Sequence, residues 1–101
     1  MDGLNALADP TRRTIVEMLG AQEMSSGEIA SHFTASAPAI SQHLKVLREA
    51  KLVTVRAEAQ SRIYALDPQG WREIEAWLDR MRGFWAKRLD TLEERLKKDQ
   101  P

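Results

Sequence analysis

The chain contains no cysteine, which excludes thiolate metal ligands, thiol catalysis and a disulfide framework. Apolar runs are short: none approaches the roughly 18 residues that a membrane-spanning helix needs, and no charged start precedes an apolar signal region. The 15 Lys and Arg residues balance 15 Asp and Glu residues, so no overall basic excess points to nucleic acid. Since 43% of the residues are hydrophobic, we expect one globular domain over residues 1–101. The absence of cysteine and of signal or membrane segments leads us to expect a cytoplasmic location.

Sequence patterns of catalysis are also missing. The chain has no nucleophile paired with a base, no glycine-rich phosphate loop, and no paired carboxylates outside helix faces that read as solvated. We therefore expect no catalytic residues and no enzymatic activity.

Charge is distributed unevenly along the chain despite the zero total. Residues 1–35 hold two cations and five anions, whereas residues 36–66 hold five cations and two anions. A local basic excess is what contact with a phosphate backbone requires. The middle of the chain is therefore the candidate nucleic-acid-binding region.

Helix-capping residues divide the chain into elements. Asp9-Pro10 is an N-cap followed by proline at the first helical position, and Gly20 is the expected end of that helix. Ser25 with Glu28 matches the capping box, and Ser36 is the cap of a third helix. Asp67-Pro68 opens a long final helix. The short turn between the second and third helices has the spacing of a helix-turn-helix.

The third helix, about residues 36–50, has the pattern of a DNA-recognition helix. Ile40, Leu44 and Leu47 share one face, which anchors the helix on a core. The opposite face and the capped start carry small or polar side chains and one cation, which suit the major groove. These candidate DNA-binding residues are Ser36, Ala37, Pro38, Ala39, Ser41, Gln42, His43 and Lys45.

A change of period from 3.6 to 2 after Ala50 predicts a β-hairpin at about residues 52–66. We expect one face to hold Val53, Val55, Ile63 and Ala65, and the connection at residues 58–61 to be broad because it lacks glycine. Arg56 and Arg62 flank the connection and are further DNA-binding candidates. Helices followed by a hairpin and a last helix make the predicted fold a winged helix-turn-helix, mainly α with a small β-hairpin.

The final helix, about residues 68–98, carries an apolar stripe close to a heptad seam. Its members are Ile74, Leu78, Met81, Trp85, Leu89, Leu92 and Leu96. A domain of this size has too little core to cover so long a helix, so we predict a dimer interface. Leu4 and Leu7, at the other end of the chain, are expected to join it.

Three segments resemble the signature of ArsR-type winged helix-turn-helix regulators, over nearly the whole chain. They are Ala8-Asp-Pro-Thr-Arg-Arg-Thr-Ile15, Ser36-Ala-Pro-Ala-Ile-Ser-Gln-His-Leu-Lys-Val-Leu-Arg-Glu-Ala50 and Leu52-Val53. The resemblance implies a cytoplasmic homodimer that represses transcription from a near-palindromic operator in double-stranded DNA. Lys51 replaces the family's usual left-handed glycine, at a cost of roughly 1 kcal/mol. Gln60-Ser61 stand where the family's wing often has glycine.

Better-known members of that family sense metals, through a cysteine pair before the recognition helix or through His, Asp and Glu on the last helix. Here residues 24–33 contain no thiol, and the final helix contains no histidine. His32 and His43 lie on different helices without the spacing of ligands. We therefore predict a branch of the family with no metal site and no cofactor, and the sequence identifies no small-molecule inducer.

Two other functions remain open for this fold. One is a winged helix that associates only with proteins, and the other is a small-molecule-responsive regulator with an aromatic pocket at the dimer interface. An association module should expose apolar side chains at the front of the recognition helix, where this chain has Ser41, Gln42, His43 and Lys45. Sequence-specific DNA binding is the predicted function.

Overall fold

The computed structural model describes residues 2–99. Five helices and three strands follow one another as α1 (Asp2–Ala6), α2 (Pro10–Ala21), β1 (Met24–Ser25), α3 (Ser26–Ser31), α4 (Ala37–Glu49), β2 (Val53–Glu58), β3 (Ser61–Leu66) and α5 (Pro68–Lys98). This mainly helical fold with a small antiparallel sheet confirms the predicted winged helix-turn-helix.

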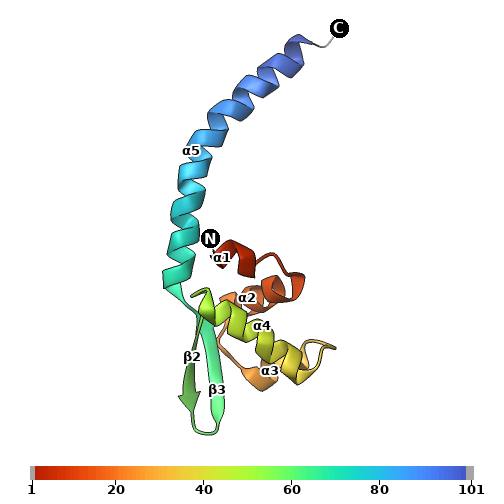
Figure 1. Cartoon of the computed structure of the whole chain (residues 1–101), viewed down its shortest axis with the longest axis vertical. Helices are drawn as coiled ribbons and strands as arrows, with labels where there is room; N and C mark the ends of the chain where they lie inside the picture. The colour runs from red at the N-terminus through yellow and green to blue at the C-terminus, as the bar shows by residue number, and fades with distance from the viewer. Residues whose placement is uncertain (1, 100–101) are drawn as a thin grey trace.

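The molecule has a rounded part and a long projection (Figure 1). We call residues 2–77 the body and residues 78–98 the distal helix. The radius of gyration is 18.6 Å, against about 13 Å for a compact chain of about 100 residues. The longest dimension is 66 Å, and the 31 residues of α5 alone span ~46 Å. Among residues 2–99, no helix is both long and apolar enough to cross a membrane.

The predicted helix starts are confirmed, because each depends on local hydrogen bonds. The Asp9 carboxylate accepts from the backbone N–H of Arg12 at 3.1 Å. Ser25 and Glu28 form the complete capping box, with both bonds present. The expected end at Gly20 was wrong by a residue: α2 continues to Ala21 and ends where the backbone becomes extended.

The sheet has the order β1-β3-β2 and includes a strand that the sequence analysis missed. β1 is a two-residue strand in which Met24 pairs with Tyr64. In the hairpin, Val53 pairs with Leu66 and Val55 with Tyr64, so these four residues share the face toward the core. The expected face was therefore wrong for Ile63 and Ala65. Successive side chains of a strand point to opposite faces of the sheet, and the pairing of Val55 with Tyr64 puts Ile63 and Ala65 on the other face.

The hairpin connection is tight rather than broad, which corrects the sequence-based expectation. Glu58 pairs with Ser61, leaving two residues in the turn. Ala59, the first of these, has a φ of 55°, the sign that a type II′ turn requires and that glycine usually supplies. Lys51 has a φ of 63°, which confirms the left-handed conformation expected after the recognition helix.

The core of the body joins all its elements, and its largest fully buried side chains are Ile15, Ile29, Ile40, Leu44, Leu47, Leu52 and Val53. The start of α5 is fixed to this core by hydrogen bonds. The backbone N–H of Gly70 donates to the Lys51 carbonyl at 2.9 Å, and Trp71 Nε1 donates to the Leu52 carbonyl at 3.0 Å. These bonds set the direction in which α5 leaves the body.

Candidate nucleic-acid interface

The recognition helix α4 is held from behind by the core. Ile40, Leu44 and Leu47 are each at most 2% exposed, as their shared helical face predicts. Ile29 of α3, at the other side of the turn, is also fully buried. Because its back is fixed, α4 presents its opposite face to solvent. Its C-terminal end lies near the start of α5, and its N-terminal end points away from the distal helix (Figure 1).

The outer face of α4 carries most of the predicted contact residues. Ser41, Gln42 and Lys45 are exposed, and Ala39 is half-buried. The capped start, with Ser36, Ala37 and Pro38, is exposed as well. The Ser36 hydroxyl accepts from the backbone N–H of Ala39 at 3.3 Å, so it serves as the cap. The face offers hydrogen-bonding groups and one cation, and it matches the chemistry of a major groove.

His43 differs from its neighbours, because it points toward α2 instead of outward. Its Nδ1 lies 3.2 Å from Arg12 Nη1 and 3.9 Å from Asp9 Oδ2, and its side chain is 23% exposed. The sequence analysis grouped His43 with the DNA-facing residues, because helical periodicity alone does not show which flank of a helix a neighbour covers. The structure places it between two helices.

The two wing arginines lie on opposite faces of the hairpin. Arg62 pairs with Ala57 and shares the face of Tyr64, whereas Arg56 lies opposite Ile63. The Arg56 guanidinium binds the carboxylates of Glu23 and Glu58. The hydrogen bonds that Arg56 donates to Glu23 and Glu58 raise its pKa, and the bond to Glu23 contributes the most.

The Arg62 side chain is exposed. Arg56 would have to leave two carboxylates before it could bind phosphate, so Arg62 is the better placed of the two for DNA contact.

Comparison with known proteins identifies the class of this interface. Residues 9–55 match the family described as bacterial regulatory protein, arsR family. The chain is 48% identical over 84 residues to the HTH-type transcriptional regulator Rv2034 of Mycobacterium tuberculosis, covering 83% of this chain and 76% of that protein. The chain belongs to the ArsR family.

Two further similarities extend this result. The transcriptional repressor SdpR of Bacillus subtilis is 36% identical over 73 residues, which cover 72% of this chain and 81% of that protein. A crystal structure of a possible transcriptional regulator for arsenical resistance has 44% identity and a TM-score of 0.76, covering 100% of this chain and 98% of that one. This ArsR-family protein is thus a DNA-binding transcriptional regulator and not an enzyme.

The sequence analysis predicts that this branch of the family has no metal site. Within residues 2–99, no three His, Asp or Glu side chains gather closely enough to hold a metal ion.

The predicted dimer residues of this ArsR-family chain fall into three groups. Ile74 is 6% exposed and belongs to the core of its own body. Leu4 and Leu7 are half-buried and pack against the same core, and Met81 is half-buried. The residues of the third group are each 44% to 58% exposed, and they are Leu78, Trp85, Leu89, Leu92 and Leu96.

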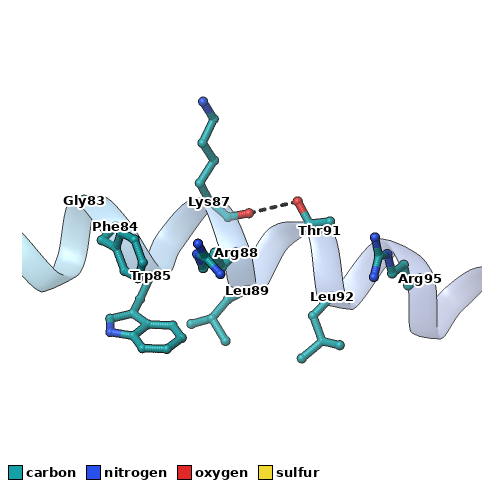
Figure 2. A pocket seen from close by; sticks show the side chains of 9 residues that line it. All are labelled: Gly83, Phe84, Trp85, Lys87, Arg88, Leu89, Thr91, Leu92 and Arg95. Carbon is teal, nitrogen blue, oxygen red and sulfur yellow. Dashed lines mark hydrogen bonds between the residues drawn. The ribbon is translucent and has the colours of Figure 1, made fainter.

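The exposed stripe lies on one side of the distal helix (Figure 2). Trp85, Leu89 and Leu92 project to the same side, whereas Lys87 points the opposite way. Phe84 also exposes 49% of its surface beside the stripe and lies under the Arg88 guanidinium at 4.5 Å.

Two arginines with a structural role were missed by the sequence analysis. Arg12 Nε donates to the Ala6 carbonyl at 2.6 Å, and Arg13 Nη1 donates to the Leu7 and Ala8 carbonyls at 3.1 and 3.2 Å. These bonds reach the carbonyl of the last residue of α1 and the carbonyls of the two residues that follow it, where a helix end leaves acceptors without helical partners. The adjacent pair Arg12-Arg13, directly after a helix start, was the available signal.

Proposed function

We propose that this chain is a homodimeric repressor that binds a near-palindromic operator in double-stranded DNA. Its α4 enters the major groove, and its wing lies against the adjacent backbone. The observation that carries the proposal is the contrast within α4, whose back is fixed in the core and whose front exposes Ser41, Gln42 and Lys45. Repression is the activity in the name of the relative SdpR, which supports the sign of regulation.

Each exposed residue of α4 suits a different contact. The amide of Gln42 can donate to and accept from an adenine edge, and the Ser41 hydroxyl can do the same with any base. Lys45 supplies positive charge one turn further along, where a phosphate is the expected partner. Arg62 extends the same role to the wing, because its guanidinium is exposed and can reach phosphate or the minor groove.

The homodimer follows from the exposed stripe of the distal helix. Monomeric proteins rarely leave a continuous row of Leu and Trp side chains in water. A two-fold operator needs two recognition helices about 34 Å apart. One chain supplies one such helix, so a second copy joined through the stripe provides the missing half.

Direct readout by Gln42 is the test of the proposal. We expect Gln42→Ala to weaken binding to an operator selected from random duplexes by ~1–3 kcal/mol, with little change on a scrambled duplex. The control is Gln22→Ala, on an exposed residue at the end of α2. Fluorescence anisotropy with both duplexes measures the effect. Equal losses on both duplexes would show that Gln42 contacts only the backbone.

A further inference from the structure

His43 connects the recognition helix to the segment before α2. Its Nδ1 atom lies 3.2 Å from Nη1 of Arg12. The same guanidinium donates through Nε to the Ala6 carbonyl at 2.6 Å. A continuous set of contacts therefore runs from the end of α1, through Arg12 on α2, to the middle of α4. His43 directly follows Gln42, so its contact with Arg12 helps to set the orientation of the outer face of α4.

This contact requires a neutral imidazole. The guanidinium of Arg12 can only donate hydrogen bonds and is always charged. Nδ1 of His43 must therefore accept, with the ring proton on Nε2. Protonation would place an N–H and a full positive charge against the Arg12 cation at 3.2 Å.

One carboxylate offsets part of that charge, since the backbone hydrogen bond from Arg12 and the attraction of His43 both lower the pKa of Asp9. Among residues 2–99, Asp9 is the one carboxylate that comes within 4 Å of the ring, with its Oδ2 at 3.9 Å from Nδ1. The Asp9 carboxylate already accepts the capping bond from the Arg12 backbone at 3.1 Å. Residues one turn away on α4, such as Ala39, Val46 and Leu47, are uncharged.

We propose that His43 is a positioning residue for DNA recognition, and that its protonation weakens operator binding by releasing α4 from Arg12. The inference depends on the proposed function, since it assumes that α4 binds the operator. Its sign is distinctive. A histidine that faced DNA would gain phosphate attraction when protonated, so acid would tighten binding. A histidine that holds α4 through Arg12 gives the opposite trend.

The experiment measures operator affinity of the full chain by fluorescence anisotropy between about pH 8 and pH 6, the range in which histidine commonly changes charge, at constant ionic strength. We expect the dissociation constant of the parent to rise about three- to tenfold as the pH falls. His43→Asn keeps an acceptor near the position of Nδ1 but does not titrate, so its affinity should not change between pH 8 and pH 6.

Two further variants separate this role from simpler ones. Arg12→Gln offers an uncharged donor to His43 and should also flatten the profile, even if His43→Asn fails to fold. His32→Asn removes the other histidine, which is exposed at the end of α3, and should leave the parent's profile unchanged.

Three results would overturn the inference. They are a flat profile for the parent, tighter operator binding in acid, or a profile that survives in both His43→Asn and Arg12→Gln. In each of these three cases, operator binding by the parent at pH 8 would leave the proposed DNA binding intact. If the parent binds no duplex at pH 8, the proposed function itself fails, and the inference fails with it.

Discussion

The body and the distal helix contain similar apolar side chains, but the body buries them and the distal helix exposes them. Leu44 in the body is 2% exposed, whereas Leu92 in the distal helix is 52% exposed. The body buries its leucines among strands and helices that are distant in sequence. The distal helix has no other element of its own chain, within residues 2–99, to cover its stripe (Figure 1). One region completes its core alone, and we propose that the other covers its stripe with a second copy of the chain.

The hydrogen bonds and ion pairs of the two regions differ in how far apart in the sequence their partners lie. The start of α5 is tied to Lys51 and Leu52 by long-range bonds. The distal helix has local pairs, such as Arg82 with Asp79 at 3.0 Å and Lys97 with Glu93 at 3.6 Å. Exposed pairs of this kind contribute about 0.2–0.5 kcal/mol each. Local pairs therefore support the helix but do not replace packing, which is the main source of helix stability.

The same substitution at two glycines of α5 should break this comparison most sharply. A Cβ at Gly70 would lie 2.3 Å from the Lys51 carbonyl oxygen, a backbone atom that cannot move aside. A Cβ at Gly83 would meet nothing within 4 Å. We expect Gly70→Ala to destabilise the body by more than about 4 kcal/mol, and Gly83→Ala to stabilise the helix by about 0.5–1 kcal/mol.

Thermal and urea unfolding of both glycine variants measures the difference. Each variant acts as the control for the other, because both replace a glycine by alanine within one helix. Equal effects from the two substitutions would show that Gly70 is not constrained by the chain that precedes the hairpin.

A charge placed in the stripe should separate association from folding. Leu89→Asp puts a carboxylate where we propose that the second copy packs, and we expect it to weaken dimerisation about a hundredfold. Lys87→Asp introduces the same side chain on the opposite side of the distal helix and should leave the dimer intact (Figure 2).

Sedimentation equilibrium at micromolar concentration checks this, with circular dichroism to show that the body stays folded. A parent that sediments as a monomer, or a Leu89→Asp variant that stays dimeric, would remove the distal helix from the interface. The operator affinity of Leu89→Asp should fall along with dimerisation, since a single chain reaches one half-site.

What the sequence predicts well are features that depend on neighbouring residues. The cap at Asp9 and the capping box at Ser25 each need partners within about three positions, and both were predicted. β1 was missed because two residues carry no period, and its pairing with β3 joins residues about 40 positions apart. The face of Ile63 was wrong because register is set across the hairpin, by a turn that residue types alone did not reveal.

Site residues follow the same division. The outward position of Gln42 follows from helical period, and the structure shows it exposed. The inward position of His43 depends on Arg12, 31 residues earlier. The pairing of Arg56 depends on Glu23, 33 residues earlier. Contacts over such separations carry no local signal, so the sequence could propose these residues but not place them.

Two left-handed residues allow a smaller, stabilising change within the body. Lys51 at a φ of 63° and Ala59 at a φ of 55° carry a Cβ in a region that favours glycine. We expect Lys51→Gly to raise the free energy of unfolding by about 1 kcal/mol, because it relieves this strain. Lys98→Gly, in the last turn of α5, lacks that strain and should not stabilise. Urea unfolding at fixed concentration measures both, and equal results would mean that Lys51 is unstrained.

The smallest effect that we expect concerns acid and the capping box. Hydrogen bonds from the Ser25 backbone and hydroxyl lower the pKa of Glu28 below its ordinary value. A carboxylate whose pKa is lowered by folding stabilises the native state at pH above its unfolded value, and this contribution is lost as the pH falls through the folded value. Glu28→Gln keeps the box geometry without a titrating group. Its unfolding free energy should therefore change less than the parent's between about pH 6 and pH 3.

Glu17→Gln removes an exposed carboxylate from the middle of α2 and serves as the control. If Glu28→Gln and the parent lose stability in parallel over this range, the ionised form of Glu28 is not favoured by folding, and the box stabilises α3 through geometry alone.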